Sequence, residues 1–461
     1  MSDGSTVIVW FRRDLRLADN PALAEACEHA RRVVALYIHA PEEEGDWQPG
    51  AASRWWLHHS LERLAASLRA RGSELHIRRG PTLAALLAIA RETGATQVFW
   101  NRLYEPAIAA RDARIAAGLD EAGLHAESFN AALLVEPWDA RTAQGTPYRV
   151  FTPFWRSCAA SVASQPRPRP APASIASARV PGPGLAIGQL ALLPAIRWDA
   201  GLSAAWIPGE EGALHRLEAF CATALAGYDA GRNRPDLPDT SRISPHLHFG
   251  EIGPRQCLAS VRNAQADRPG SGAAAETFLR EIGWREFAHH LLHHFPHTPT
   301  EPLDERFAHF PWSPDPAWLE AWQRGRTGFP IVDAGMRELW TTGWMHNRVR
   351  MIVASLLTKN LRQPWLDGAR WFWDTLVDAD LASNTLGWQW TAGCGADAAP
   401  YFRVFNPALQ AARHDPDGSY VRRWLPDFVR DYPQPIVDLQ ESRAAALAGY
   451  ARIKAGAARP A

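Results

Sequence analysis

The chain has 461 residues, enough for two or three domains at roughly 100–200 residues each. Hydrophobic residues make up 46% and charged residues 21%, a balance that excludes a mainly disordered chain. Basic and acidic residues number 49 each, so a surface for nucleic acid must come from local clustering and not from net charge.

Residues 1–135 alternate between strand-like and helix-like segments, the pattern of a parallel sheet in a Rossmann-like α/β domain. Periodicity predicts helices over Trp55–Leu68 and Leu83–Arg91, and Asn20 before Pro21 marks the start of the first crossover helix. No G-x-G-x-x-G follows the first strand, so a dinucleotide would have to bind elsewhere. The predicted strands are Val7–Phe11, Val33–Tyr37, Leu75–Ile77 and Gln97–Trp100.

Residues 136–208 are predicted to connect two domains. From Ser161 to about Leu202 they are rich in Pro, Ala, Ser and Gly, which favours extended chain over a packed core. Residues 209–461 have helical patterns almost throughout, so we expect an all-α second domain.

Two segments of this second domain, Glu276–Phe295 and Trp344–Leu361, are predicted helices with a core stripe and an unusual opposite face. The residues opposite the stripes are Glu281, Trp284 and Arg285 on the first helix, and Asn347, Arg350 and Met351 on the second. Such side chains could line a mostly apolar pocket with a few polar groups. The alternative is that each helix is buried on both sides.

Two further segments contain the residue types of metal sites. Asp378 and Asp380, with Asn384, lack the additional carboxylate or histidine that would complete one. The run His289–His297 lacks an H-E-x-x-H glutamate, and we expect it to be a surface face. We therefore predict no metal site.

The five cysteines are scattered without a C-x-x-C pair, which indicates neither a disulfide framework nor a zinc knuckle. The longest apolar run, Leu83–Ala90, is far shorter than the ~20 residues of a membrane-spanning helix, and no secretory signal pattern opens the chain. We expect a cytoplasmic protein that does not associate with membranes.

Several long motifs occur in order over nearly the whole chain. They are V-W-F-R-R-D-L-R-L-A-D-N at 9–20, G-R-N-R-P at 231–235, T-S-R-I-S at 240–244, E-I-G-W-R-E-F at 281–287, T-G-W-M-H-N-R at 342–348, and the stretch from 378 to 403. Together they resemble the DNA photolyase/cryptochrome family. The resemblance implies an N-terminal antenna-binding domain, a long linker, and a helical domain that binds FAD in a bent form and a DNA lesion.

The resemblance also implies the flavin contacts. Tyr228 and Thr240–Ser244 are similar to the family's phosphate and ribose contacts, for which an ordinary helix cap is the alternative. Arg350 resembles the partner that offsets the charge of the acidic segment beside the isoalloxazine edge and adenosine; a solvated acidic turn is the alternative there. The implied FAD contacts are Tyr228, Thr240, Ser241, Arg242, Ile243, Ser244, Arg350, Asp378, Ala379, Asp380 and Asn384.

Asn384 occupies the position that faces flavin N5 in the family. An amide both donates and accepts hydrogen bonds and so suits a reduced flavin, whereas plant cryptochromes have an acid there. Trp388, Trp365 and Trp312 resemble the family's relay of three indoles between the surface and the flavin, with ordinary core packing as the alternative.

The lesion pocket is implied in the same way. Trp284 and Trp390 resemble its stacking walls, and Glu281 resembles the carboxyl that hydrogen-bonds the pyrimidine edge. A surface salt bridge with Arg285 is the alternative for Glu281. The predicted contacts with lesion and DNA are Glu281, Trp284, Arg285, Asn347, Arg348, Met351 and Trp390.

The expected reaction is light-driven splitting of cyclobutane pyrimidine dimers, by electron transfer from excited reduced FAD to a flipped-out lesion. Photolyases of (6-4) photoproducts have a histidine proton donor near the position of Met351, whose thioether cannot donate a proton, so the dimer is favoured. A cryptochrome-type blue-light sensor is the alternative; Asn384 and the short stretch after Lys454 argue against it. A light-independent flavin oxidoreductase would need a nicotinamide-binding motif, which is absent.

The antenna chromophore is less directly indicated. Residues 41–56 and 100–106 look more like plant cryptochromes and the bacterial photolyases similar to them than like the best-known bacterial folate-binding enzymes. Those enzymes bind folate with an Asn-Glu pair, and this chain has Ala107 and Ile108 in its place. We expect methenyltetrahydrofolate at another site, with a deazaflavin as the alternative. The stretch Asp427–Tyr432 is shorter than is usual in the family. We expect a monomer whose partner is UV-damaged DNA.

Overall fold

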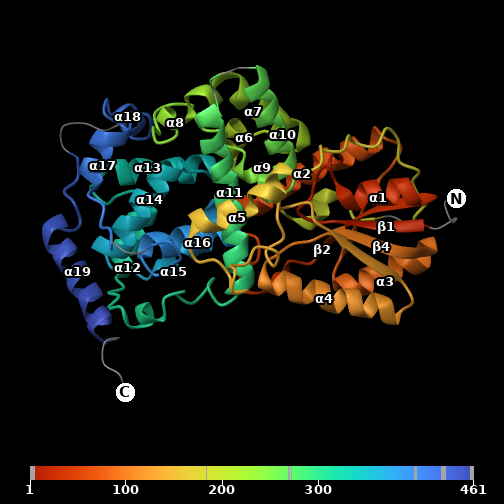
Figure 1. The fold of residues 1–461 in the computed structure, drawn as a ribbon, viewed down its shortest axis with the longest axis horizontal. Helices are drawn as coiled ribbons and strands as arrows, with labels where there is room; N and C mark the ends of the chain where they lie inside the picture. Colours follow the sequence, from red (N-terminus) through yellow and green to blue (C-terminus); the bar gives the residue numbers. More distant parts are fainter. Residues whose placement is uncertain are drawn as a thin grey trace.

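The computed structural model describes residues 6–182, 184–267, 270, 272–398, 402–426 and 432–456. An α/β domain and a larger helical domain lie next to each other (Figure 1). The first contains a parallel sheet of five strands in the order β3-β2-β1-β4-β5. Its strands are β1 (Thr6–Phe11), β2 (Arg32–His39), β3 (Leu75–Arg79), β4 (Ala95–Asn101) and β5 (His125–Phe129).

Helices cover both faces of this sheet, because its strands are apolar on both sides. One face packs against α1 (Pro21–His29) and α2 (Ala51–Arg69), and the other against α3 (Thr82–Thr93) and α4 (Pro106–Glu121). The side chain of Asn20 accepts a hydrogen bond from the Leu23 amide and caps α1, which confirms the predicted start. The four predicted strands and both predicted helices are confirmed as well.

The sequence did not predict β5. This strand lies at the edge of the sheet and pairs with β4 alone. None of its residues is fully buried, so it has no apolar run that would distinguish it from a loop.

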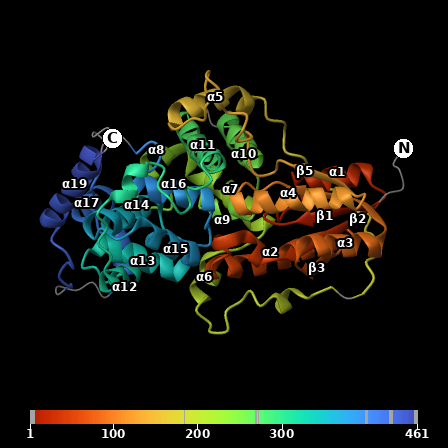
Figure 2. The same ribbon diagram turned by 90° about the horizontal axis from the view of Figure 1, so that it is seen from below.

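The segment predicted as a connector contains a helix, α5 (Phe151–Ala163). Phe151, Phe154, Cys158 and Val162 recur at helical spacing and pack into a core of the helical domain. After α5 the chain is mostly extended, as predicted, and runs along the α/β domain (Figure 2). Backbone hydrogen bonds join Val33 in β2 to this extended chain at its residues 176 and 178.

The helical domain is built around two hydrophobic cores. None of the helices in the described part of the chain is long and apolar enough to cross a membrane. Its helices are α6 (Ala200–Ala205), α7 (Glu210–Thr223), α8 (Tyr228–Gly231), α9 (Ser244–His248), α10 (Pro254–Asp267), α11 (Gly272–His294), α12 (Pro316–Gln323), α13 (Pro330–Thr342), α14 (Asn347–Ser355), α15 (Trp365–Thr375), α16 (Leu381–Ala392), α17 (Pro407–His414), α18 (Ser419–Trp424) and α19 (Leu439–Gly456).

The helix predicted from Trp344 begins instead at Asn347. The side chain of His346 accepts a hydrogen bond from the Arg348 amide and so caps α14. The helix continues into a π-helical turn over Leu356–Asn360, within the predicted span. Its predicted core stripe is buried, and the opposite face, with Asn347 and Met351, is less buried.

The expectation of a surface face over the histidine run is wrong for its first half. His289 and His290 are buried on α11, because the chain before α5 packs against this helix. The two ring nitrogens of His290 contact the Pro137 carbonyl and the Tyr148 amide. The segment Asp427–Asp431, within the shortened stretch, lies outside the described residues.

Candidate functional site

The loop before α16 and the start of α9 meet at a network of short polar contacts. The Ser244 hydroxyl donates to Asp378 Oδ2 at 2.6 Å, and Arg350 Nη2 lies 2.9 Å from the same oxygen. Arg350 comes from α14, so three separate elements converge here. The structure thus pairs Arg350 with Asp378, as the sequence led us to expect, and adds a contact from Ser244, which the sequence placed among the phosphate and ribose contacts.

The turn before α9 holds Arg242 in an unusual conformation. Its φ is 51°, in the left-handed region that non-glycine residues rarely adopt outside functional sites. The guanidinium lies over the rings of Trp206 and Trp344, with Cζ 4.7 and 4.5 Å from their centroids. Its buried Nε finds no hydrogen-bond partner among the described residues. An unpartnered buried donor of this kind suits an anionic ligand such as a pyrophosphate.

The neighbouring predicted FAD residues differ in exposure. Thr240 and Ser241 are half-buried in the turn, whereas Ile243 and Ala379 are buried. Tyr228 is also buried and packs edge-on against Phe278, 5.5 Å between ring centroids. These packed residues fix the walls of the site and leave the turn itself accessible to a ligand.

Asp380 has a structural role in addition to the predicted one. Its side chain caps α16 by accepting from the Ser383 amide at 2.8 Å. The other carboxylate oxygen lies 3.6 Å from His248 Nδ1 and 3.7 Å from His289 Nε2. Asp380 therefore joins α9, α11 and α16, and the alternative of a solvated acidic turn is wrong for this carboxylate, which is almost covered.

Asn384 lies one turn into α16. Its Nδ2 donates to the Ala369 carbonyl of α15 at 3.0 Å. One N–H and the amide oxygen remain for a ligand, so the group retains both hydrogen-bonding capacities.

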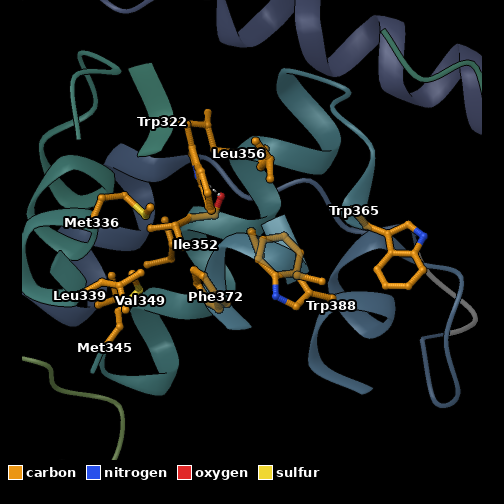
Figure 3. Close-up of a cluster of buried hydrophobic side chains, with 14 of the residues drawn as sticks. Trp322, Met336, Leu339, Met345, Val349, Ile352, Leu356, Trp365, Phe372 and Trp388 are labelled. Atoms are coloured by element: carbon orange, nitrogen blue, oxygen red, sulfur yellow. Dashed lines mark hydrogen bonds between the residues drawn. The ribbon is translucent and has the colours of Figure 1, made fainter. Parts of the chain in front are cut away.

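The three predicted relay indoles become more exposed in the order Trp388, Trp365, Trp312, from α16 outward. Trp388 is 3% exposed, Trp365 is 6% exposed, and Trp312 is half-buried. In Figure 3, Trp388 lies between Trp365 and the pair of Trp322 and Phe372. The ring centroids of Trp388 and Phe372 are 5.0 Å apart. The structure thus places the first indole deep in the core and the last one near solvent.

Glu281 of α11 forms an ion pair with Arg232, which follows α8. Glu281 Oε1 lies 2.6 Å from Arg232 Nη2, and both side chains are partly exposed. Burial raises the pKa of Glu281, and Arg232 opposes that rise. The alternative partner considered for Glu281, Arg285, is wrong because its guanidinium turns away and donates to the Ala132 carbonyl.

The predicted DNA contacts fall into two sets. Arg348 and Met351 lie together, with 3.6 Å between Arg348 Nη1 and Met351 Sδ, and Arg348 also donates to Asn233 Oδ1. Asn347 is exposed at the start of the same helix. Arg285, by contrast, lines a cavity between the two domains. Although Arg285 lies one turn from Glu281 on α11, its side chain does not pair with Glu281.

The two predicted stacking walls belong to helices that pack against each other, α11 and α16. Trp284 stacks on Phe151 of α5, with 3.9 Å between ring centroids and an interplanar angle of 11°. Trp390 lies under the guanidinium of Arg403, with 5.3 Å from Cζ to the ring centroid. Both indoles are only partly buried, so each presents some ring surface.

Comparison with known proteins identifies the family. Residues 7–173 match the family described as DNA photolyase, and residues 278–430 match the FAD binding domain of DNA photolyase. A deoxyribodipyrimidine photo-lyase of Agrobacterium fabrum is 44% identical over 476 residues, which covers 97% of this chain and 98% of that protein. The chain belongs to the DNA photolyase family. This confirms the resemblance and assigns FAD binding to the helical domain.

Two further relatives place the chain within the photolyase family. A bacterial class III photolyase from Agrobacterium tumefaciens has a similar structure, with a TM-score of 0.92, 43% sequence identity and 98% coverage of both chains. Cryptochrome-1 of Arabidopsis thaliana is 40% identical over 480 residues, covering 96% of this chain and 69% of that protein. The relatives of this chain thus include proteins named as photolyases and proteins named as cryptochromes.

Sequence reasoning missed three contributors to the site. Arg232 lies within a recognised motif, but its pairing with Glu281 depends on how α8 packs against α11. His248 and His289 lie in separate segments, and only the fold brings them to Asp380. The histidine run was visible in the sequence, but nothing in it indicated an acidic partner.

Proposed function

We propose that this protein repairs DNA by splitting cyclobutane pyrimidine dimers in a light-dependent reaction with bound FAD. The observation that carries the proposal is the match to a deoxyribodipyrimidine photo-lyase over nearly the full length of both chains. The arrangement of Ser244, Arg350 and Asp378, with Asn384 one turn along α16, supports it independently.

The residues present fit FAD. The unpartnered Nε of Arg242, beside the accessible turn 240–241, would hold the pyrophosphate. Arg350 and Asp378 would lie at the isoalloxazine edge, where the Ser244 hydroxyl holds the carboxylate. When bound and reduced, FAD absorbs light and supplies the electron that splits the dimer.

Asn384 would face N5 of the isoalloxazine ring. Because the Ala369 carbonyl takes one of its N–H groups, the amide is held in place while its oxygen stays available to accept a hydrogen bond. An amide has no proton to release at neutral pH, so this residue supports a reduced flavin without acting as an acid.

The lesion would enter between the indoles of Trp284 and Trp390. Stacking on aromatic rings contributes about 1–3 kcal/mol per base and offsets the cost of flipping the damaged bases out of the duplex. Arg348 and Asn347 would contact the backbone and base edges, and Met351 would supply an apolar, polarisable surface. Glu281 would hydrogen-bond the pyrimidine edge.

Trp388, Trp365 and Trp312 would carry electrons inward from the surface. Their order of increasing exposure supports this role, since a relay needs one buried and one solvent-accessible end. Replacing Trp388 with phenylalanine should slow light-driven reduction of an oxidised cofactor while leaving dimer binding unchanged.

A second, antenna chromophore would bind at the α/β domain. A cavity of about 310 Å³ lies where the turn Pro41–Trp47 meets the start of α4, lined by Trp47, Ala107 and Trp373. A smaller cavity lies at the carboxyl ends of β1 and β2, where ligands of open parallel sheets bind. Methenyltetrahydrofolate is the proposed occupant, with a deazaflavin as the alternative, and the absorption spectrum of the purified protein distinguishes them.

A cryptochrome-type sensor is the second candidate, favoured by the 40% identity to Cryptochrome-1. The deciding experiment measures binding to an oligonucleotide with a single thymine dimer and to the undamaged sequence, in darkness at two salt concentrations, followed by illumination. Repair predicts preferential binding and loss of the dimer under blue light. Equal affinity for both oligonucleotides and an unchanged dimer would contradict it, while a steep salt dependence alone shows only phosphate contact.

A further inference from the structure

We propose that Arg232 is a latch on Glu281: it holds the carboxylate in the free protein and transfers to a DNA phosphate when the dimer enters, so that Glu281 meets the pyrimidine edge as the protonated acid. This inference rests on the proposed function. It adds a residue that couples recognition of the DNA backbone to the protonation of the lesion pocket.

In the structure, Arg232 and Glu281 form the ion pair that the proposal requires before DNA binds. Arg232 Nη2 lies 2.6 Å from Glu281 Oε1, and the two side chains are 26% and 30% exposed. The guanidinium also lies 5.6 Å from the ring centroid of Tyr228. Glu281 is thus paired with a partly exposed arginine that comes from outside its own helix.

The surrounding charges favour an anion at this place. Arg232 and Arg348 are near enough to Glu281 to stabilise its charge, and Arg280 on α11 adds to them. Burial lowers the pKa of the Arg348 guanidinium, and the positive charges of Arg232 and Arg413, which both lie near it, lower that pKa further. Tyr228 is an acidic group that interacts with Glu281, and burial raises the pKa of Tyr228 so that it is neutral. A single carboxylate therefore offsets the charge of several arginines. A phosphodiester bound beside them would add a negative charge and reduce the repulsion between their guanidinium groups.

The charged carboxylate can serve only part of the lesion edge. A pyrimidine edge presents carbonyl oxygens beside its N3–H; an ionised carboxylate can accept from the N3–H but has no donor to offer the carbonyls. When Arg232 moves to a phosphate, Glu281 loses its closest counter-charge while the lesion covers it. Burial raises the pKa of Glu281, and nothing as close then opposes the rise. The carboxylate takes up a proton from water and its new O–H donates to the carbonyl.

Proton uptake on binding is the direct measurement. Isothermal titration calorimetry in darkness, with the FAD-bound protein and the thymine-dimer oligonucleotide in buffers of different ionisation enthalpy, gives the number of protons taken up. The wild type should take up a fraction of a proton near neutral pH. Arg232→Met should reduce this uptake about twofold or more, since its Glu281 is already more protonated before binding. Glu281→Gln should abolish it.

Two further variants serve as controls. Arg234→Met removes a nearby arginine that is instead paired with Asp236 at 2.6 Å, so proton uptake should stay at the wild-type value. Arg232→Lys retains the charge and should restore most of the uptake. Dimer binding and repair without any proton uptake, or an uptake unchanged in Arg232→Met, would overturn the latch. Absence of preferential dimer binding and of repair would instead contradict the proposed function.

Discussion

The amide of Asn384 links two helices, and in the proposed function it also faces the cofactor. Its Nδ2 donates to the Ala369 carbonyl and links α16 to α15. Replacing Asn384 with alanine leaves that carbonyl unpaired and removes the group proposed to face the flavin. We expect a loss of about 1 kcal/mol in the free energy of unfolding and faster reoxidation of the reduced flavin in the dark. Absorption spectroscopy after anaerobic reduction and admission of air measures the rate.

Ser383→Ala is the matched control for this prediction. Ser383 is exposed and contributes only its backbone amide to the cap from Asp380. Reoxidation should therefore match the wild type. If Asn384→Ala also reoxidised at the wild-type rate, the amide would have no role at the flavin.

Glu286 provides a residue-scale prediction about pH. Its Oε2 accepts from the Leu134 and Val135 amides, whereas its buried Oε1 has no hydrogen-bond partner in the described structure. Burial raises the pKa of Glu286 from 4.5 to about 7, so between these values the folded state binds more protons than the unfolded state. Stability due to this group is therefore complete at low pH and falls as pH rises from 4.5 to about 7, by on the order of 3 kcal/mol.

Glu286→Gln should remove this pH dependence, since the amide oxygen can still accept from both backbone groups. The difference in melting temperature between variant and wild type should grow in favour of the variant from pH 5 to pH 8, in roughly the interval that linkage assigns to this group. Glu276→Gln, at the exposed start of α11, should follow the wild-type profile. Parallel profiles of Glu286→Gln and wild type would contradict the assignment.

At the scale of elements, the contact between α15 and α16 positions the first relay indole. A Cβ on Gly368 would lie 2.1 Å from Trp388 Cη2 and 2.4 Å from Cζ3. Gly368→Ala should force the indole to move, lowering the free energy of unfolding by about 1–3 kcal/mol. Light-driven reduction of the flavin should slow in parallel. Chemical denaturation and absorbance under illumination measure the two effects.

Gly387 is the matched control on the other side of α16. It is exposed, and a Cβ there would meet no atom within 4 Å. Gly387→Ala should stabilise the helix by about 0.5–1 kcal/mol without changing photoreduction. Equal photoreduction in Gly368→Ala and Gly387→Ala would show that the position of Trp388 is not limiting.

The sequence predicted helices and strands well where the spacing of apolar residues reflects which side of the element is buried. The strands buried on both faces and the core stripe of α14 are examples. It missed β5, whose edge position leaves no apolar run, and α5, whose helical stripe lies beside a Pro-rich segment. At the site, linear motifs singled out Ser244 and Asp378, which are in contact in the structure, although their contact with each other was not predicted. The turn of Arg285 towards Ala132 depends on packing between segments distant in sequence, so no local pattern could reveal it.

At the scale of the whole molecule, the α/β domain contacts the proposed flavin site through α9. The turn after α9 docks against the loop that follows β1: the Leu15 amide donates to the Phe249 carbonyl, and Arg16 Nη1 donates to the Gly250 carbonyl at 2.9 Å. At its other end α9 begins with Ser244, which holds Asp378. A helix of little more than one turn thus joins the contact between the domains to the residues proposed to bind the flavin.

Gly250 allows this close docking. Its φ is +63°, and a Cβ there would lie 2.2 Å from the Arg13 carbonyl oxygen. Gly250→Ala should therefore displace α9 from the α/β domain and disturb the contact between Ser244 and Asp378. Gly123→Ala is the control, because Gly123 has a similar φ of +74° but open space around it, so it adds only the backbone strain of about 1–2 kcal/mol. The ratio of flavin to protein absorbance after gel filtration should fall in Gly250→Ala and stay at the wild-type value in Gly123→Ala. Equal flavin retention in the two variants would mean that the α/β domain does not support the cofactor through α9.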